Sequence, residues 1–279
     1  MASNPMESQG DFLELLRASG HPFATRTMPG GGAPYPSTVQ PAGHPAYVPG
    51  TDTHGTTVIA VKYDKGVLNV GDRRATASNA IVYDRAEKVI ALDDHCLISI
   101  SGSFAKSLEV IRYLRSSFKY FSRTQLQEMS LDGKLNELSR IIAGNLAAAM
   151  QGIGLFIPVL SAYDLDRQEG RIFFYDGMGA RFETEEFAAA GSGSERIRGS
   201  FDYIIRTKGP FREMNLDTAL HESLVLLDIA ADLDSATGGY GKILPVAKTV
   251  TAEGVDEIPE EDLRRITESI INAAPAGRI

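Results

Sequence analysis

The chain has 279 residues, of which 43% are hydrophobic and 23% are charged, proportions that are ordinary for a globular protein. Its formal net charge of −8 and the lack of any Lys/Arg block argue against nucleic acid or an anionic membrane as the main partner. No apolar run approaches the ~20 residues that a membrane-spanning helix requires, so a membrane protein is not predicted either.

Residues 1–55 differ in composition from the rest of the chain, since they hold 8 of the 13 prolines and 8 of the 27 glycines. Residues 11–19 are predicted to form a short amphipathic helix, but a segment of this composition cannot bury enough apolar surface to offset its chain entropy. The first residues also lack the basic start and apolar core of a secretory signal. Composition leaves two interpretations open, a disordered tail or a prosegment that is removed at Gly55.

The pattern changes at Thr56, where an apolar, β-branched run begins. Residues 57–63 and 67–72 flank the turn signal Asp64-Lys65-Gly66, which predicts a β-hairpin that Thr56 opens and Asp72 closes. Further short strands are predicted at residues 80–83, 88–92, 96–101, 155–163, 171–175, 187–190 and 243–250.

Four helices are predicted from apolar residues that recur at three- and four-residue spacing or from charged, helix-favouring runs. They span residues 104–121, 131–150, 216–231 and 259–272. The order is therefore strands, two helices, strands, two helices. Because each sheet must be covered by helices, this order predicts layered α+β packing.

The side chains that most often carry catalysis are poorly placed here. Three of the five histidines lie in residues 1–55, and His95 and His221 stand in no nucleophile elbow or metal-binding pair. Cys96 is the only cysteine, which excludes an intrachain disulfide, and it is predicted to be a small buried residue in a strand. The sequence therefore predicts neither a histidine-based triad nor a zinc site.

A threonine, an aspartate and a lysine remain as candidates for chemistry. A threonine that is the first residue of a chain can act as a nucleophile, because its own α-amine takes the hydroxyl proton. A cut after Gly55 would give Thr56 that position, with Asp72 brought near it by the hairpin. Lys88 opens a nearby strand, where its charge would favour an alkoxide and lower the pKa of the amine. Spacing alone leaves open whether Asp72 and Lys88 are an ordinary structural ion pair.

Six short motifs follow one another along the chain in a characteristic order. They are Gly55-Thr56-Thr57, Gly71-Asp72-Arg73-Arg74-Ala75-Thr76, Lys88, Ser101-Gly102-Ser103, Gly191-Ser192-Gly193-Ser194 and Asp234-Ser235-Ala236-Thr237-Gly238-Gly239. Together they resemble the proteasome β subunits, and specifically those of actinobacteria. The Pro/Gly-rich leader and residues 145–152 are similar to the same bacterial group, and the resemblance covers about residues 55–250.

This resemblance implies an N-terminal-nucleophile hydrolase fold, a four-layer αββα sandwich of two antiparallel sheets. Residues 1–55 would be a propeptide that self-cleavage between Gly55 and Thr56 removes, leaving residues 56–279 as the catalytic domain. Thr56 would be the nucleophile, Asp72 and Lys88 would complete its triad, and the backbone N–H of Gly102 would bind the oxyanion. The amine of Thr56 would be supported by Ser192, Asp234 and Thr237, the last a position where the family more often has serine.

A peptide substrate would bind as an added strand between residues 75–77 and 102–104. By resemblance, its binding residues would be Ala75, Thr76, Ala86, Ile90, Ile100 and Gly102. The specificity pocket among them is uncharged and apolar, which favours chymotrypsin-like cleavage after apolar residues. The alternative is that these residues are simply part of the core.

The resemblance further implies a cytoplasmic threonine endopeptidase of the proteasome core particle, without a metal or cofactor. Its partners would be other β subunits in seven-membered rings, proteasome α subunits, and a ring ATPase that delivers unfolded or tagged proteins. Two alternatives remain, an N-terminal-nucleophile amidase acting on a small amide and a catalytically silent ring subunit. A silent subunit would be expected to lack Thr56 or Lys88, and this sequence has both.

Overall fold

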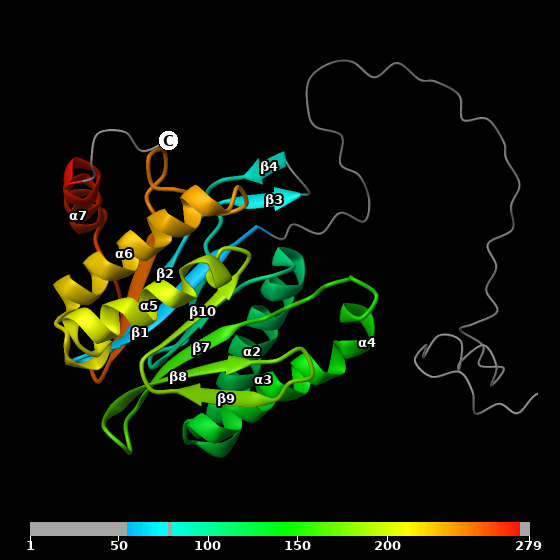
Figure 1. Cartoon of the computed structure of the whole chain (residues 1–279). Coiled ribbons are helices and arrows are strands. Elements are labelled where there is room, and N and C mark those ends of the chain that lie inside the picture. Colours follow the sequence, from blue (N-terminus) through cyan, green and yellow to red (C-terminus); the bar gives the residue numbers. More distant parts are fainter. Residues whose placement is uncertain (1–54, 78–79, 274–279) are drawn as a thin grey trace, which may run out of the picture. The chain divides into compact units, whose positions relative to one another are not determined.

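The computed structural model describes residues 55–77 and 80–273, which form two five-stranded antiparallel sheets with helices outside them (Figure 1). The first sheet has the spatial order β10 (Phe187–Gly191), β1 (Thr57–Tyr63), β2 (Gly66–Gly71), β11 (Val246–Thr251) and β12 (Gly254–Glu257). The second sheet has the order β5 (Val89–Asp93), β6 (Cys96–Ser99), β7 (Val159–Asp164), β8 (Glu169–Tyr175) and β9 (Arg181–Thr184). A separate two-stranded ribbon joins β3 (Ala75–Ala77) to β4 (Ala80–Tyr83).

The helices cover the outer face of each sheet (Figure 1). They are α2 (Phe104–Gln125), α3 (Leu131–Gly144), α5 (Ser194–Lys208), α6 (Leu216–Leu233) and α7 (Glu260–Ala273). The short helix α4 (Leu146–Ala149) has no buried residue, and a 3₁₀ turn, η1 (Phe211–Glu213), lies between α5 and α6. Leu114 of α2 and Leu138 of α3 pack with Ile98 of the second sheet. Phe201 of α5 and Leu227 of α6 share a second core cluster with the first sheet. The predicted four-layer αββα architecture is therefore confirmed.

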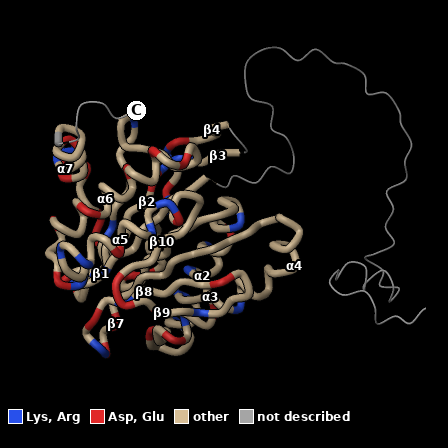
Figure 2. Tube along the Cα trace, viewed as in Figure 1, with Lys and Arg blue, Asp and Glu red and all other residues tan. Residues whose placement is uncertain are grey.

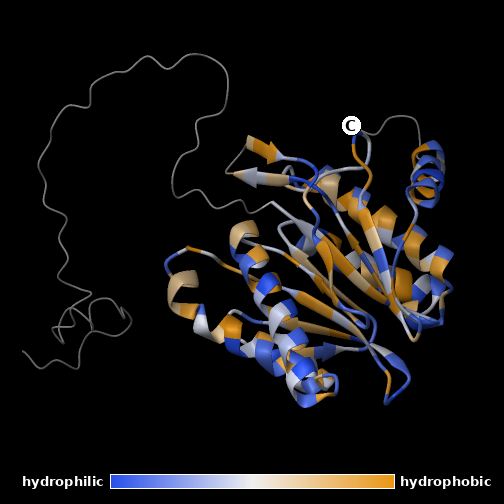
Figure 3. Cartoon of the chain, turned by 180° about the vertical axis from the view of Figure 1, so that it is seen from behind, coloured by the Kyte–Doolittle hydropathy of each residue, from blue (hydrophilic) through white to orange (hydrophobic). Residues whose placement is uncertain are grey.

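Strand β1 shows why the two sheets stack face to face. All seven of its residues are buried, so a strand of this composition must be covered on both sides. Ile59 and Val61 contact the helix layer, whereas Val58 and Ala60 belong to a third cluster that lies between the sheets. Successive side chains of a strand point to opposite faces, which explains this division. Figure 3 shows the hydrophobic residues concentrated on the strands, and Figure 2 shows most charged residues on the helices and turns around them.

The predicted helix at 131–150 is wrong as a single element. Helix α3 ends at Gly144, and Asn145 separates it from the four-residue α4. The side-chain amide of Asn145 donates a 2.6 Å hydrogen bond to the carbonyl oxygen of Gly154, which ties the break to the following loop. Asparagine favours such local bonds to the backbone over helix continuation.

Helix α5 and the strands β9 and β12 were not among the predicted elements. Only Ile197, Phe201 and Ile204 of α5 are buried, at spacings of four and three residues, and the charged residues between them dilute the pattern. Strands β9 and β12 have four residues each, lie at sheet edges and carry polar side chains. A short edge strand leaves little hydrophobic signal in the sequence.

The strands predicted at 155–163 and 243–250 also begin too early in the sequence. The observed strands β7 and β11 begin at Val159 and Val246, each directly after a proline. Proline has no backbone N–H to give to the ladder, so pairing starts beyond it. The predicted leader helix at 11–19 lies outside the described residues, and none of the described helices is long and apolar enough to cross a membrane.

Candidate active site

Thr56, Asp72 and Lys88 meet where strands of the two sheets begin or end. Thr56 directly precedes β1, whose bounds match the predicted strand at 57–63. Asp72 follows β2 and Lys88 precedes β5, so the predicted strands at 67–72 and 88–92 are each wrong by one residue at these positions. The antiparallel pairing of β1 with β2 nevertheless brings Thr56 and Asp72 together, as the hairpin predicted. All three residues are buried, with 5%, 1% and 1% of their surface exposed.

The Lys88 ammonium group has three hydrogen-bond acceptors around it. Its Nζ lies 2.7 Å from Asp72 Oδ1 and 2.9 Å from the carbonyl oxygen of Gly55, and it also donates to the carbonyl of Arg74. Three acceptors match the three N–H donors of a charged lysine. Burial lowers the pKa of Lys88 below its ordinary value, while the Asp72 carboxylate opposes that shift. The cation therefore contacts the carbonyl that precedes Thr56.

The Asp72 carboxylate is oriented by three backbone N–H groups in addition to Lys88. Oδ1 accepts from Thr57 at 2.7 Å, and Oδ2 accepts from Arg74 and Gly238 at 2.9 Å each. Hydrogen bonds to an ionised acceptor are among the stronger ones in proteins. The position of the carboxylate is thus set by the backbone, and Lys88 binds to an acceptor that is already held in place.

The peptide bond between Gly55 and Thr56 lies inside this cluster. The hydroxyl of Thr56 donates to the Gly55 carbonyl oxygen at 2.5 Å, so this oxygen accepts from both Thr56 and Lys88. A Cβ atom on Gly55 would lie 2.2 Å from Oγ1 of Thr76 and 2.7 Å from the carbonyl oxygen of Ala236. Only glycine therefore fits before Thr56 in this arrangement.

A second hydrogen-bonded cluster lies on the other side of Thr56. The hydroxyls of Ser192 and Thr237 each lie 2.6 Å from Oδ2 of Asp234, and the Ser192 hydroxyl is 3.4 Å from the carbonyl oxygen of Thr56. Burial opposes ionisation, yet the hydrogen bonds from Ser192 and Thr237 hold the pKa of Asp234 below its ordinary value. The structure thus brings the three predicted supporting residues together next to Thr56.

Gly102 lies between the second sheet and helix α2, in a conformation that requires glycine. Its φ is +90°, and a Cβ atom there would lie 2.2 Å from the carbonyl oxygen of Leu155. Gly102 and Phe156 form a bridge whose hydrogen bonds come from the N–H groups of Ser103 and Ile157. In such a pair the N–H of Gly102 itself points to the opposite side, as a backbone oxyanion donor must.

The residues predicted to form the specificity pocket are all buried. They are Ala75, Ala86, Ile90 and Ile100, with Thr76 beside them. Ile90 and Ile100 pack in the cluster under α2 and α3, so these two side chains are part of the hydrophobic core of the second sheet. Their part in substrate selection stays a prediction.

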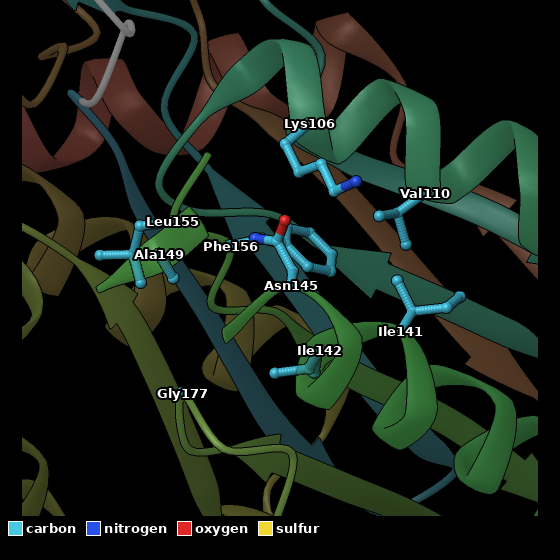
Figure 4. Close-up of a pocket in the computed structure, with 9 residues that line it drawn as sticks. All are labelled: Lys106, Val110, Ile141, Ile142, Asn145, Ala149, Leu155, Phe156 and Gly177. Atoms are coloured by element: carbon cyan, nitrogen blue, oxygen red, sulfur yellow. The ribbon is translucent and has the colours of Figure 1, made fainter. Parts of the chain in front are cut away.

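Three of the cavities in the described part of the chain lie at different distances from this cluster. A cleft of about 70 Å³ adjoins it, with Arg74, Ile81 and Gly238 in its wall. The small cavity in Figure 4 lies where α2, α3 and the loop after α4 meet, and it is lined by Lys106, Asn145 and Phe156 among others. A larger cavity of about 1000 Å³ lies by the β5–β6 and β7–β8 turns, at the opposite ends of the strands from Lys88. The first of these is thus the one that borders the cluster.

Sequence reasoning gave no role to two residues that hold the site together. Arg74 donates from Nη1 to the carbonyl oxygens of Ser235 at 2.9 Å and Thr237 at 3.0 Å, which links the turn after β2 to the loop after α6. Thr57 donates its N–H to Asp72 and places its hydroxyl 2.6 Å from that of Thr237. Both residues lie inside the recognised motifs, but only the folded chain reveals these partners.

Two stacked antiparallel sheets between helix layers, with a threonine before a central strand and a lysine–aspartate pair beside it, define the class of N-terminal-nucleophile hydrolases. A family model described as "Proteasome subunit" matches residues 52–244. The chain therefore belongs to the proteasome subunit family. It is of the β type, a threonine endopeptidase that acts in protein degradation and assembles with other proteasome subunits.

Curated relatives agree with this assignment. "Proteasome subunit beta 2" of Thermomonospora curvata is 38% identical over 223 residues, which cover 79% of this chain and 78% of that protein. "Proteasome subunit beta" of Acidothermus cellulolyticus is 36% identical over 242 residues, covering 84% and 80%. "Proteasome subunit beta" of Streptomyces griseus subsp. griseus is 35% identical over 221 residues, covering 78% and 76%.

Proposed function

We propose that this β subunit becomes active when it cleaves its own chain between Gly55 and Thr56, which frees Thr56 as the nucleophile. The observation that carries the proposal is the environment of the Gly55 carbonyl oxygen. It accepts hydrogen bonds from the Thr56 hydroxyl at 2.5 Å and from Lys88 Nζ at 2.9 Å. The group to be attacked, the attacking hydroxyl and a stabilising cation therefore lie in one cluster.

Self-cleavage proceeds as a shift of the acyl group from nitrogen to oxygen. Oγ1 of Thr56 attacks the Gly55 carbonyl carbon, and Lys88 stabilises the negative charge that develops on the carbonyl oxygen. The C–N bond then breaks, the proton from the hydroxyl ends on the new amine, and an ester joins Gly55 to Thr56. Water hydrolyses this ester, which releases residues 1–55 as a propeptide and leaves residues 56–279 as the catalytic domain.

Peptide hydrolysis uses the same residues with the amine of Thr56 now free. The amine takes the proton of the Thr56 hydroxyl as it attacks the substrate carbonyl. Lys88, held by Asp72, favours the alkoxide, whereas Ser192, Asp234 and Thr237 orient the amine. The N–H of Gly102 binds the oxyanion.

Substrate binding follows the arrangement that the resemblance implies. An extended peptide pairs with residues 75–77 and 102–104, where Thr76 and Gly102 supply backbone hydrogen bonds. Ala75, Ala86, Ile90 and Ile100 receive the side chain before the cut. Because these four side chains are apolar, cleavage is favoured after apolar residues.

At the level of the particle, we propose a cytoplasmic core assembly. This subunit forms seven-membered β rings, and rings of α subunits bind to them. A ring ATPase delivers unfolded or tagged proteins into the closed chamber. Membership of the proteasome family and similarity to curated β subunits support this arrangement.

Thr56 variants test the nucleophile directly. The full chain is co-produced with its α partner, and intact mass and hydrolysis of a fluorogenic peptide with an apolar residue before the cut are measured. We expect wild type to give a species that starts at Thr56, and Thr56→Ala to keep its leader. Versions without the leader separate catalysis from processing. There we expect Thr56→Ser to be slower but active, and Thr56→Ala to lose most of an acceleration that is about 10⁶-fold or more in enzymes generally. Peptide hydrolysis by the alanine variant at a comparable rate would show that the nucleophile lies elsewhere.

A further inference from the structure

The hydroxyl of Thr57 is part of a buried hydrogen-bonded chain behind the nucleophile. Thr57 is fully buried, and its Oγ1 lies 2.6 Å from Oγ1 of Thr237. The same oxygen accepts a 3.2 Å hydrogen bond from the backbone N–H of Gly193. Thr237 is also fully buried and contacts Asp234 at 2.6 Å. A fully buried hydroxyl must find its partners inside the protein, and those of Thr57 belong to the cluster around Asp234.

The direction of each hydrogen bond in the chain follows from counting protons. Asp234 is ionised and can only accept, so Thr237 spends its single hydroxyl proton on Asp234 Oδ2. The bond between Thr57 and Thr237 must then be donated by Thr57. The lone pairs of Thr57 receive the N–H of Gly193. The chain therefore runs from Gly193 through Thr57 and Thr237 to Asp234, and each donor polarises the next.

The two ends of this hydrogen-bonded chain meet at one turn, because its first donor, Gly193, and a second donor to Asp234, Ser192, are neighbours in sequence. Ser192 precedes Gly193 in sequence and donates its own hydroxyl to Asp234 Oδ2 at 2.6 Å. The Ser192–Gly193 turn is therefore held by two contacts, one from Gly193 to Thr57 at the start of the hydrogen-bonded chain and one from Ser192 to Asp234 at its end. A Cβ atom on Gly193 would lie 2.4 Å from the Thr57 hydroxyl and 2.8 Å from that of Thr237, so the close approach depends on glycine.

Thr57 also contacts the other half of the site. Its backbone N–H donates to Asp72 Oδ1 at 2.7 Å, the same oxygen that binds Lys88. One residue therefore holds the Asp72–Lys88 pair through its main chain and the Asp234 cluster through its side chain. Because Thr57 follows Thr56 directly and is the first residue of β1, both contacts fix how the backbone of Thr56 is oriented at the start of that strand.

We infer that Thr57 is a positioning residue for catalysis, which acts through its hydroxyl on Thr237 and so on Asp234 and Ser192. The inference rests on the proposed function, in which these residues orient the amine of Thr56. Replacing the hydroxyl with a methyl group removes the donor to Thr237 and the acceptor of Gly193, while the volume and β-branching stay the same. Peptide binding does not involve this hydroxyl, so kcat changes and KM does not.

The test compares variants of the full chain, co-produced with its α partner, in leader release and in steady-state peptide hydrolysis. We expect Thr57→Val to lower kcat about tenfold, the rate equivalent of one net hydrogen bond, with KM unchanged. Thr57→Ser keeps the hydroxyl and is expected to restore most of kcat. Thr267→Val is the matched control, because Thr267 is a buried threonine of α7 whose hydroxyl donates, within the described residues, to the helix carbonyls of Leu263 and Arg264. Its kcat is expected to equal that of wild type.

A double-mutant cycle shows whether Thr57 acts through Thr237. In a Thr237→Val background, Thr57→Val is expected to lower kcat by less than about threefold further, because the shared path is already broken. A full tenfold fall in that background would overturn the inference. Unchanged kcat in the single Thr57→Val variant, or an effect confined to KM, would overturn it as well.

Two further measurements keep the outcomes distinct. If Thr57→Val does not assemble, Thr57→Ser is compared with Thr57→Cys, which differs only in replacing oxygen by a weakly donating sulfur. Equal kcat in that pair would overturn the inference, and a loss of about tenfold in the cysteine variant would support it.

Thr56→Ala is run alongside, because activity in that variant contradicts the proposed nucleophile. Loss of activity in Thr56→Ala with wild-type kcat in Thr57→Val contradicts the role of Thr57 alone.

Discussion

At the scale of single residues, the buried ion pair of the site is unequal in its two halves. Asp72 accepts from three backbone N–H groups as well as from Lys88. Lys88, in contrast, donates to Asp72 and to the carbonyl oxygens of Gly55 and Arg74. Both of those residues are also held by other hydrogen bonds, from Thr56 to Gly55 and from Arg74 to Asp72. Removing the aspartate therefore leaves four donors without an acceptor, whereas removing the lysine leaves the carboxylate with three donors.

This inequality predicts different stabilities for two variants. Asp72→Ala is expected to destabilise the chain by about 3–5 kcal/mol, the range for a buried pair that loses one partner. Lys88→Met is expected to cost less, by at least about 1 kcal/mol, because the carboxylate keeps its backbone donors. Melting temperature and circular dichroism of the two variants measure the order. Equal melting temperatures, or a lower one for Lys88→Met, would contradict the argument.

The same pair is expected to behave differently in catalysis. Both variants should lose leader release and peptide hydrolysis, since Lys88 Nζ donates to the Gly55 carbonyl oxygen and Asp72 helps to hold it there. The informative case is Lys88→Met, which we expect to be folded and inactive. A folded Lys88→Met chain with substantial peptide hydrolysis would remove Lys88 from the mechanism.

At the scale of elements, the sequence predicted most of the architecture because strongly patterned segments form most of it. Strand β1 is buried on both faces and has an apolar run from Val58 to Val61, and both β1 and β4 have the predicted bounds. Helix α5 was missed because three buried side chains in 15 residues give a weak signal. The break at Asn145 was missed because it depends on a hydrogen bond to Gly154, which no local pattern encodes.

The candidate site could be predicted only in part for a related reason. Spacing along the hairpin brought Thr56 and Asp72 together, and resemblance added Ser192, Asp234 and Thr237. Thr56, Asp72 and Ser192 lie on separate segments that the register of the first sheet joins, whereas Asp234 and Thr237 share the loop after α6. The contacts of Thr57 and Arg74 need atomic distances, so the sequence left them without a role.

The turn between the second sheet and α2 gives a prediction at this scale. Gly102→Ala places a Cβ atom 2.2 Å from the Leu155 carbonyl oxygen at a φ of +90°, so the backbone must move. We expect a loss of about 10²-fold or more in kcat, as for removal of an oxyanion donor. Gly144→Ala is the control, since a Cβ atom there meets nothing within 4 Å, and its activity should be unchanged. Peptide hydrolysis by assembled particles decides, and wild-type kcat in Gly102→Ala would contradict the prediction that the substitution displaces the N–H of residue 102 from the oxyanion.

At the scale of the whole molecule, the site joins segments from both sheets. Thr56, Asp72 and Ser192 lie at the ends of strands in the first sheet, whereas Lys88 and Gly102 flank strands of the second. Their distances thus depend on how the two sheets are held against each other. The cluster between the sheets, to which Val89 and Leu97 belong, sets that relation. The outer cluster lies between the second sheet and helices α2 and α3, so it does not separate the site residues of the first sheet from those of the second.

This arrangement predicts that the same leucine-to-alanine truncation has unequal effects on activity at two places in the core. Leu97 lies between the sheets and Leu138 lies under the outer helices, and both are fully buried leucines. Leu97→Ala and Leu138→Ala are each expected to destabilise the chain by about 2–5 kcal/mol, the range for such truncations in protein cores. Only Leu97→Ala should lower kcat at a temperature where both variants are folded, because a relaxed inter-sheet core shifts Lys88 relative to Thr56, and small misplacements of catalytic groups are costly. Thermal melting fixes the temperature, and peptide hydrolysis by assembled particles gives kcat. Equal kcat values for the two variants would contradict a role for the inter-sheet core in aligning the site.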